Sequence, residues 1–277
     1  MGLRINTNTQ SIAAQRNLGV NQAGQNNSLE KVSSGSRINK AADDAAGLAI
    51  AAKMQASIRS LRQDQRNAQD GISMIQTAEG AMSEVGNILI RMRELSIQAA
   101  SDTIRDEERG FVDKEVQALK SEISRIAQST EYNGTKILNG ESGTLEIQVG
   151  LNNNPEEDRF QYDRSQANTT VDRLGISDVS TASKENSQNN LASLDTAIKQ
   201  VSENRSAMGA LQNRMQSAFA HMQTYEENLS GARSRIIDTD MASETAELTK
   251  RNILSQAGTS VLSQANQNGM LALKLIG

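Results

Sequence analysis

The sequence predicts a mainly α protein: an elongated antiparallel helical bundle or coiled coil with a small β-hairpin region, whose N- and C-terminal helices pair at one end. Apolar residues recur at alternating spacings of three and four over long stretches, which is the pattern of a coiled-coil seam. Aromatic residues make up only 2% of the 277 residues, whereas wide layered cores draw much of their burial from aromatic side chains. The only proline is Pro155, so long helices are permitted on both sides of it.

The N-terminal segment, residues 3–32, is expected to be a helix with one loose apolar stripe. The stripe consists of Leu3, Ile5, Ile12, Leu18, Val20, Leu29 and Val32. Gln and Asn fill most of the remaining positions, and Asn, Gly and Ser are middling to poor helix formers. We therefore expect this segment to lay one face on a partner and not to hold itself helical alone.

A joint is expected at residues 33–36, where Ser-Ser-Gly-Ser interrupts the pattern. The next helix should begin near residues 40–44, with Asn39 as its cap, because the Asn side chain can accept a bond from an unpaired backbone N–H of the first turn. Asp43 and Asp44 would stabilise the positive end of the helix dipole. The alternative, a cation site at these two carboxylates, is disfavoured because no other oxygen ligands lie at loop spacing.

The longest apolar seam lies between residues 48 and 100. Its members are Ile58, Leu61, Gln65, Ala68, Ile72, Ile75, Ala78, Met82, Val85, Leu89, Met92, Leu95 and Ala99. A helix of this extent would be ~80 Å long at the usual rise per residue. A break is expected at residues 101–103, followed by a shorter seam over residues 112–126, and the short connection implies an antiparallel return.

Turn signals and strand-like alternation then replace the helical pattern. Residues 133–134 are Asn-Gly, and residues 145–149 alternate apolar and polar side chains. The chain turns at residues 151–155, so residues 159–162 can return as the second strand of a β-hairpin. Residues 165–190 are polar and irregular apart from a short apolar Leu-Gly-Ile stretch.

Helical order is expected to resume near Asn186 and to continue to Leu229, with Met208, Met215 and Met222 as core positions seven residues apart. A charged, non-periodic stretch after Gly231 resembles the first joint. The tail repeats the character of the N-terminal segment, and its stripe consists of Ile253, Leu254, Ala257, Val261, Leu262 and Ala265.

The predicted domain organisation follows from these joints. Residues 1–44 and 233–277 should form the two halves of one terminal coiled-coil domain. Residues 45–232 should form the helical bundle, with the β-hairpin region at about residues 131–185.

Composition excludes several classes of function. There are no cysteines, which removes disulfides, thiolate catalysis and Cys-ligated metals. The net charge is −4 with both signs dispersed, so no basic block indicates nucleic acid, and no stretch approaches the ~18 apolar residues of a membrane span. The single histidine, His221, is accompanied by no metalloprotease, phosphate-loop or nucleophile motif. We expect no enzyme activity, cofactor or metal.

At this point the chain resembles a bacterial flagellin over roughly residues 1–140 and 190–277. The matching stretches are INTN at 5–8, VSSGSRINKAADDAAGLAIA at 32–51, RNAQDGISMIQTAEGAM at 66–82, IRMRELSIQAAS at 90–101, EYNGTKIL at 131–138, LQNRMQSA at 211–218, ENLSGARSRIIDTDMA at 227–242 and NILSQAGTSVLSQANQ at 252–267. One departure is Gln25, which stands where the family usually has an apolar residue. Because little chain separates the two matching halves, we expect a short flagellin without a large outer domain.

The resemblance implies a structural subunit that polymerises into the flagellar filament for motility and is exported unfolded through the flagellar type III pathway. The filament would be extracellular, or periplasmic if the source is a spirochaete. The alternative is a hook–filament junction protein of the same family. Implied partners are further copies of the chain, an export chaperone, the filament cap and the hook-junction proteins.

The resemblance also implies two sets of contact residues. Both terminal stripes would be the assembly interface, because apolar side chains that find no cover within the monomer gain it by polymerising. Arg91, Leu95 and Glu115 align with positions at which the family contacts an animal Toll-like receptor. The competing interpretation is that the two charged residues are ordinary solvated side chains and that Leu95 belongs to the helical seam.

Overall fold

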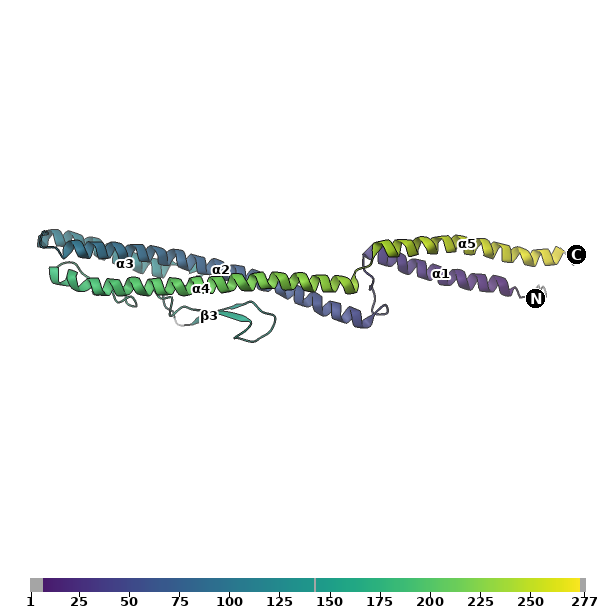
Figure 1. Ribbon diagram of the computed structural model, residues 1–277, viewed down its shortest axis with the longest axis horizontal. Coiled ribbons are helices and arrows are strands. Elements are labelled where there is room, and N and C mark those ends of the chain that lie inside the picture. The colour runs from purple at the N-terminus through teal and green to yellow at the C-terminus, as the bar shows by residue number, and fades with distance from the viewer. Residues whose placement is uncertain (1–6, 142, 275–277) are drawn as a thin grey trace. The chain divides into compact units, whose positions relative to one another are not determined.

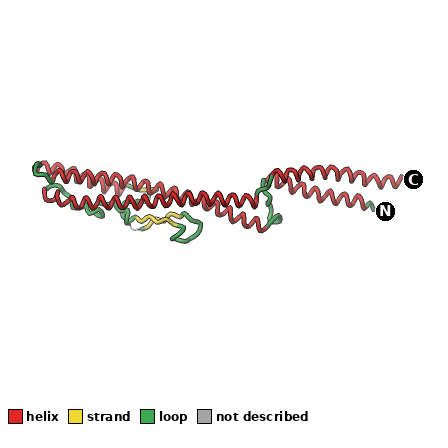
Figure 2. The backbone as a smooth tube through the Cα atoms, viewed as in Figure 1, coloured by secondary structure: helices red, strands yellow, loops and turns green. Residues whose placement is uncertain are grey.

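The computed structural model describes residues 7–141 and 143–274, the last seven of these by their backbone only, and it confirms the mainly α fold (Figure 1). The helices are α1 (Thr9–Ser34), α2 (Ala45–Ala99), α3 (Asp106–Ser129), α4 (Lys184–Ile237) and α5 (Met241–Lys274). The strands are β1 (Glu131–Tyr132), β2 (Thr135–Lys136), β3 (Thr144–Gln148) and β4 (Arg159–Asp163). Figure 2 shows how little of the chain is strand.

The chain divides into two compact units, each described here by itself. The terminal unit comprises Met1–Ile58 and Glu227–Gly277, and the bundle unit comprises Arg59–Glu226. The boundary between them falls within α2 and within α4. The domain boundaries expected from the sequence near residues 44 and 232 stay a prediction.

The start of α2 differs in detail from the expectation. The helix begins at Ala45, and its cap is Asp44, whose Oδ1 accepts the N–H of Gly47 at 2.8 Å. Asn39 is not the cap; its Nδ2 donates to the hydroxyl of Ser34 at 2.8 Å. Asp43 bonds within the turn that precedes α2, where its Oδ2 accepts the backbone N–H groups of residues 39 and 40. These bonds lower the pKa of the Asp43 carboxyl group.

The core of the bundle unit is formed by α2, α3 and α4 together with the hairpin region. Its largest fully buried side chains are Ile75, Met82, Val85, Leu89, Met92, Leu95, Ile123, Ile137, Leu138, Ile176, Leu194 and Met215. Met208 and Met222 are buried as well, which confirms the methionines at spacing seven as core residues. Unbranched, polarisable Met side chains fill the irregular gaps of such a core.

Arg109 joins the end of α2 to the start of α3. Its guanidinium is buried and donates to the carbonyls of Ala99 and Ser101, each at 2.9 Å, and to the carboxylate of Asp106 at 2.5 Å. The last carbonyls of a helix have no partner within the helix, so these bonds satisfy acceptors that would otherwise be unpaired. The predicted break at residues 101–103 is present, and α3 returns antiparallel to α2.

Two β-hairpins follow α3. The strands β1 and β2 pair around Asn133 and Gly134, both with positive φ, where the sequence analysis predicted only a turn. The predicted hairpin is formed by β3 and β4, with Leu145 opposite Tyr162. Tyr162 is buried, donates its hydroxyl to the carbonyl of Ile137 at 3.0 Å, and has a raised pKa because of that burial.

The turn of the β3–β4 hairpin is an exposed loop with an internally bonded base. The Oδ2 of Asp158 accepts the N–H of Asn154 at 3.0 Å. A side chain at Gly150 would bring its Cβ within 2.0 Å of the Asp158 carboxylate, so this position requires glycine. The side chains of residues 151–157 are all exposed.

The segment between β4 and α4 is irregular, as predicted, but it is less solvent-exposed than its composition indicated. Leu174, Ile176 and Val179 are buried in the core of the bundle unit. Asp113 of α3 holds this segment, since its Oδ1 accepts the N–H of Thr181 at 2.6 Å.

The second joint is shorter than expected. The charged stretch after Gly231 was predicted to be non-helical, but α4 continues through it to Ile237. Only residues 238–240 separate α4 from α5, and they contact the first joint within the terminal unit. Arg37 donates its backbone N–H to the carbonyl of Ile237 at 2.5 Å, and its Nη2 to the carbonyl of Ile236 at 2.6 Å.

Candidate assembly interface

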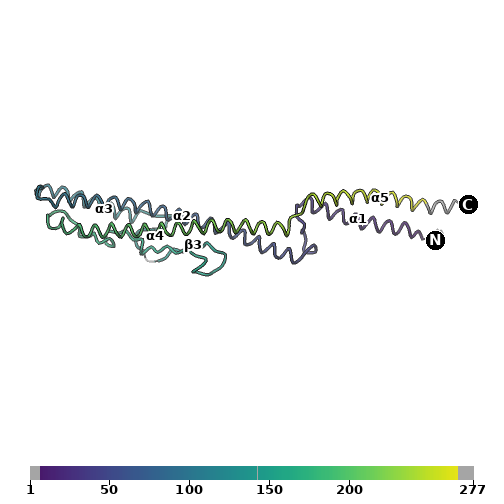
Figure 3. Tube along the Cα trace, in the orientation of Figure 1, coloured from purple at the N-terminus to yellow at the C-terminus, as the bar shows by residue number. Residues whose placement is uncertain are grey.

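Helices α1 and α5 lie side by side and antiparallel in the terminal unit (Figure 3), which confirms the predicted pairing of the terminal helices. Polar side chains make the hydrogen bonds between them. These bonds are Asn8 Nδ2 to the Ala265 carbonyl (2.8 Å), Ser11 Oγ to Asn266 Oδ1 (2.8 Å), Asn21 Nδ2 to the Arg251 carbonyl (2.8 Å) and Gln25 Nε2 to Asn252 Oδ1 (2.6 Å). Gln25, the departure from the family pattern, therefore takes part in the pairing.

Small residues permit the close approach of the two helices. A Cβ added at Gly24 would lie 1.8 Å from Nη1 of Arg251, so the guanidinium occupies the space that a side chain would need. A Cβ at Gly258 would lie 3.3 Å from Cδ1 of Leu18. The Arg251 guanidinium also pairs with Glu247 at 3.0 Å.

Most of the described residues of the two predicted apolar stripes are exposed to solvent. Exposed fractions are 58% for Ile12, 52% for Leu29, 61% for Ile253, 50% for Leu254 and 59% for Val261. Val20 and Ala257 are exposed too, Leu18, Val32 and Leu262 are half-buried, and only Ala265 is buried. Leu3 and Ile5 lie outside the described residues. Exposed apolar side chains gathered on one helix pair mark a surface that a partner covers.

A pocket of about 330 Å³ lies between the two helices in the middle of this surface. Its walls are Ala14, Asn17, Leu18 and Asn21 of α1 and Leu254, Ala257, Gly258 and Val261 of α5. The exposed stripe therefore contains a recess into which an apolar side chain can pack.

The apolar periodicity alone does not predict the polar contacts of the pairing. The signal was present as a second row at spacings of three and four. That row reads Asn8, Ser11, Ala14, Leu18, Asn21, Gln25 and Ser28. Ser11 and Ser28 are buried, so this mainly polar row, which shares Leu18 with the apolar stripe, faces α5.

The three residues that align with receptor contacts of the family differ in their exposure to solvent. Arg91 and Glu115 are both about half exposed and form an ion pair at 2.9 Å. Leu95 is only 2% exposed and belongs to the core of the bundle unit, so its side chain is not accessible to a receptor. The expectation of a receptor contact at Leu95 is corrected accordingly, because the helical seam takes this side chain inward.

No arrangement typical of catalysis accompanies these surfaces. In the part of the chain that the structure describes, no three His, Asp or Glu side chains gather in a way that could hold a metal ion. His221 is exposed and stacks on Tyr225, with ring centroids 6.3 Å apart. Within residues 7–141 and 143–274, no helix has both the length and the hydropathy needed to cross a bilayer.

Two family models match the chain on either side of the hairpin region. The model of the bacterial flagellin N-terminal helical region matches residues 5–143, and that of the C-terminal helical region matches residues 191–275. The chain belongs to the bacterial flagellin family. This flagellin is a structural subunit of the flagellar filament. No large outer domain lies between its two matched regions, as predicted.

Relatives cover this flagellin almost completely. The flagellin of Halalkalibacterium halodurans is 44% identical over 274 residues, which is 98% of this chain and 99% of the relative. The flagellar filament 30.7 kDa core protein of Treponema maltophilum is 39% identical over 283 residues, again covering 98% and 99%. The crystal structure of Bacillus cereus flagellin matches with a TM-score of 0.50 and 28% identity, over 57% of this chain and 88% of that one. Nothing here favours the hook–filament junction alternative.

Proposed function

We propose that this flagellin polymerises through the outward apolar stripes of α1 and α5. The observation that carries the proposal is the exposure of Ile12, Ile253 and Val261 on a helix pair that is joined by side-chain hydrogen bonds. Covering a Val or Ile side chain fully contributes roughly 1.5–3 kcal/mol, so a neighbouring subunit that covers several of them supplies a strong driving force. The stripe residues Leu3, Ile5, Leu18, Leu29, Val32, Leu254, Ala257 and Leu262 belong to the same interface, whereas Ala265 is buried within the monomer and is left out of it.

Polymerisation through these helices couples their full ordering to assembly. A segment that buries little apolar surface by itself meets its ordering cost only when a partner supplies the missing surface. The monomer therefore stays soluble until it joins a growing filament. In a filament such a contact is heterologous, so it does not close into a ring and propagates as a helix.

The same proposal includes the route and the partners of the subunit. The chain is exported unfolded through the flagellar type III pathway, with an export chaperone, the filament cap and the hook-junction proteins as successive partners. The absence of cysteine from the sequence fits an export route that requires an unfolded chain. The filament is extracellular, or periplasmic in a spirochaete, and the chain has no catalytic role.

The receptor hypothesis is retained for Arg91 and Glu115 alone. Both side chains are accessible and joined by an ion pair, so a receptor would contact the pair as one unit. Purified monomer should bind a Toll-like receptor ectodomain, and the double variant Arg91→Ala and Glu115→Ala should bind less. Equal binding by the variant would remove these residues from the contact.

The assembly proposal is tested by seeded growth. Full-length protein is mixed with filament fragments and followed by sedimentation and electron microscopy, beside a variant that lacks residues 1–32 and 244–277. We expect the full-length protein to elongate the seeds and the truncated protein to stay monomeric. A full-length protein that only binds hook or filament ends, without elongation, would support the junction alternative.

Point variants give a sharper test because they leave the helices intact. The double variant Ile253→Ser and Val261→Ser removes two exposed apolar side chains of α5. It should keep the circular dichroism of the monomer and raise the critical concentration for growth at least about tenfold. The matched control is Gln256→Ser with Gln264→Ser, which alters two exposed polar side chains of the same helix. Equal growth of both variants would contradict the proposal.

A further inference from the structure

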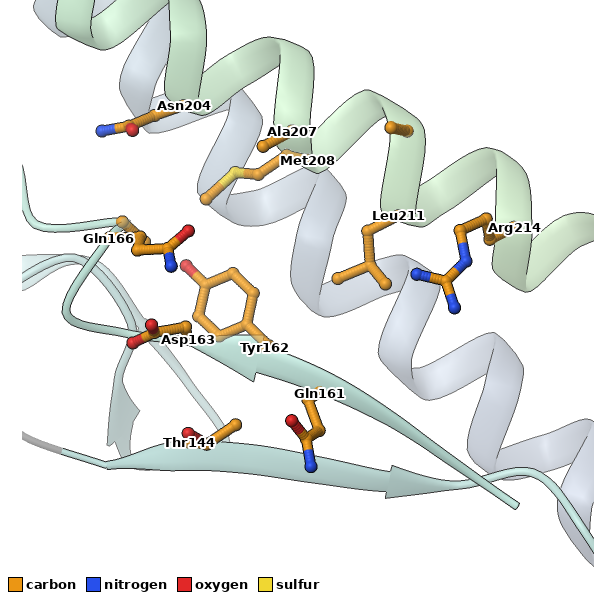
Figure 4. A pocket seen from close by; sticks show the side chains of 12 residues that line it. Thr144, Gln161, Tyr162, Asp163, Gln166, Asn204, Ala207, Met208, Leu211 and Arg214 are labelled. Carbon is orange, nitrogen blue, oxygen red and sulfur yellow. The ribbon is translucent and has the colours of Figure 1, made fainter. Parts of the chain in front are cut away.

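A second recess lies in the bundle unit, between the β3–β4 hairpin and α4 (Figure 4). It has a volume of about 490 Å³. Ala207, Leu211 and Arg214 line it from α4, and Gln161 and Asp163 line it from β4. The assembly surface of α1 and α5 contributes none of its residues, so the two recesses are independent features.

The recess has a positive end, an apolar middle and a negative end. Arg214 stands at one end, Leu211 and Ala207 follow along α4, and Asp163 stands at the other end (Figure 4). The guanidinium of Arg214 lies 5.1 Å from the ring centroid of Phe160. The carboxylate of Asp163 accepts the N–H of Ser165 at 2.9 Å and is fixed by it. Among the described residues, neither Arg214 nor Asp163 has an ion-pair partner.

The exposed face of α3 carries a row of side chains with the reverse order of charge. Glu107, Phe111 and Lys114 lie at positions i, i+4 and i+7, so they share one face of the helix. Phe111 is 61% exposed, and Lys114 Nζ lies 5.6 Å from its ring centroid. Within the described part of the chain, Glu107 and Lys114 form no ion pair. Most of this aromatic side chain is therefore open to solvent in its own subunit.

The helical part of the recess has the same length as the row on α3, and the negative end, Asp163, is supplied by β4. Glu107 and Lys114 are seven residues apart on α3, and Ala207 and Arg214 are seven residues apart on α4, so each pair spans ~10 Å along its helix. An exposed aromatic side chain flanked by a negative and a positive charge therefore matches a recess with an apolar middle and charges of opposite sign at its ends. Such complementarity fixes the orientation of an encounter and suppresses wrong partners.

We propose that the recess receives the row Glu107, Phe111 and Lys114 of a second copy of this chain. The Phe111 ring packs on Leu211 and Ala207, Glu107 pairs with Arg214, and Lys114 pairs with Asp163. The inference rests on the role of the chain as a filament subunit. Because one copy offers α3 and the next offers the recess, the contact is heterologous and adds subunits in one direction without closing.

Cross-linking tests the contact directly, since the chain contains no cysteine. Single variants Phe111→Cys and Ala210→Cys, where Ala210 is an exposed residue of α4 that lines the recess, are mixed in equal amounts, grown on wild-type seeds and oxidised. We expect a disulfide-linked dimer in filaments, and a ladder of longer covalent oligomers from the double-cysteine variant. The control pair is Phe111→Cys with Lys199→Cys, where Lys199 is an exposed residue of α4 outside the recess. Filaments that grow normally but give no 111–210 cross-link would overturn this proposal while leaving assembly through α1 and α5 intact.

Charge reversal provides a second readout. Arg214→Glu and Glu107→Arg should each raise the critical concentration about tenfold or more, because each places like charges together. The double variant should restore growth, whereas Lys199→Glu should have no effect. If the double variant grows no better than either single variant, Glu107 and Arg214 do not meet and another occupant fills the recess. Unchanged thermal unfolding of the monomers shows that the folds are intact.

Discussion

Single polar side chains bond backbone groups at the places where helices of this flagellin begin and end. The buried Arg109 supplies three donors at the turn between α2 and α3, one to the carbonyl of Ala99 at the end of α2, one to the carbonyl of Ser101 in the turn and one to the carboxylate of Asp106. Asp44 supplies one acceptor at the start of α2. Such residues fix the direction of the chain at a helix end more than hydrophobic burial does. Their removal leaves buried groups without a hydrogen-bond partner.

Replacing Arg109 with Met should lower the free energy of unfolding by about 2–4 kcal/mol. The Met side chain keeps the apolar stem, but the carbonyls of Ala99 and Ser101 lose charged donors, which are worth about 1.5–3 kcal/mol each when buried. Urea unfolding followed by circular dichroism measures the change. Arg105→Met, at an exposed neighbouring position, should change stability by less than about 0.5 kcal/mol. An equal effect of both substitutions would mean that the buried bonds are not responsible.

Asp64 is a buried acid of α2 whose replacement should stabilise the protein. It is 6% exposed, its Oδ2 has no hydrogen-bond partner among the described residues, and burial together with the charge of Asp158 raises its pKa. At pH 7 the native state therefore carries an unfavourable charge, and Asp64→Asn should raise the free energy of unfolding by about 1 kcal/mol.

The pH dependence of this effect has a definite sign. The pKa of Asp64 is higher in the folded than in the unfolded state, so its stabilising contribution is complete below the ordinary value of 3.8 and is lost as the pH rises through the raised folded value. The advantage of Asp64→Asn over the wild type should accordingly shrink on acidification towards pH 3.8. Melting temperatures measured against pH test this, with the exposed Asp70→Asn as a control that should show no such trend. An advantage that grows on acidification would refute it.

At the scale of elements, α2 shows two different uses of glycine in one helix. Gly71 is buried where α2 meets the β3–β4 hairpin and α4; an added Cβ would lie 2.3 Å from Cε of Met215 and 2.8 Å from Cδ1 of Ile147. Gly80 is exposed, and an added Cβ would meet nothing within 4 Å. Close packing requires the first glycine, whereas nothing in the packing requires the second.

Gly80→Ala should stabilise the protein by about 0.5–1 kcal/mol, because Ala is the better helix former. Gly71→Ala receives the same gain, but overpacking against Met215 and Ile147 costs about 1–3 kcal/mol. Chemical unfolding should therefore place Gly71→Ala at least about 1 kcal/mol below Gly80→Ala. If the two variants prove equally stable, the side chains near Gly71 yield more easily than the structure indicates.

Periodicity predicted the elements well and their boundaries less well. The seams of α2, α3 and α4 and the β3–β4 hairpin followed from spacing because their apolar faces are buried together. The sequence pattern predicted Asn39 as the cap of α2, whereas Asp44 caps the helix in the structure. Several neighbouring polar residues could fill this role, and the choice among them depends on the residue at which the helix begins. The extension of α4 beyond Gly231 was missed because an exposed glycine costs a helix only about 1 kcal/mol, which the continuing helix offsets.

The candidate interface could be predicted from the sequence only in part. The apolar stripes of both terminal helices were identified, but which row of each helix faces the other was not, because two rows at the same spacing occur side by side on α1. The close approach at Gly24 and Gly258 determines which row of each helix faces the other, and this approach depends on the side chains of both helices. Leu95 was assigned to a receptor contact by resemblance, and its burial in the helical seam excludes that role.

At the scale of the whole molecule, the two units differ in how they are stabilised. The bundle unit has a continuous apolar core. The terminal unit joins α1 to α5 by side-chain hydrogen bonds and leaves several large apolar side chains of these helices exposed, among them Ile12, Ile253 and Val261. Segments with few buried apolar contacts open most easily, so local stability should differ strongly between the units.

Hydrogen exchange should reveal this difference and its loss on assembly. In the monomer, amides of α1 and α5 should exchange at least about 100-fold faster than those of α2 within the bundle core. In filaments, neighbouring subunits should cover the stripes, and exchange in α1 and α5 should therefore slow by a similar factor. Mass spectrometry of both forms measures the change, and equal protection of the terminal helices before and after polymerisation would contradict coupled ordering.

The exposed loop of the β3–β4 hairpin offers a position for foreign sequence. Its base is held by the bonds of Asp158 and Asn154, whereas Glu156 and Glu157 lie at the surface. A short peptide inserted between these two glutamates would leave the base, both strands and the terminal helices unaltered. Every subunit would then display one copy, and a filament would become a regular multivalent scaffold for epitopes or affinity tags.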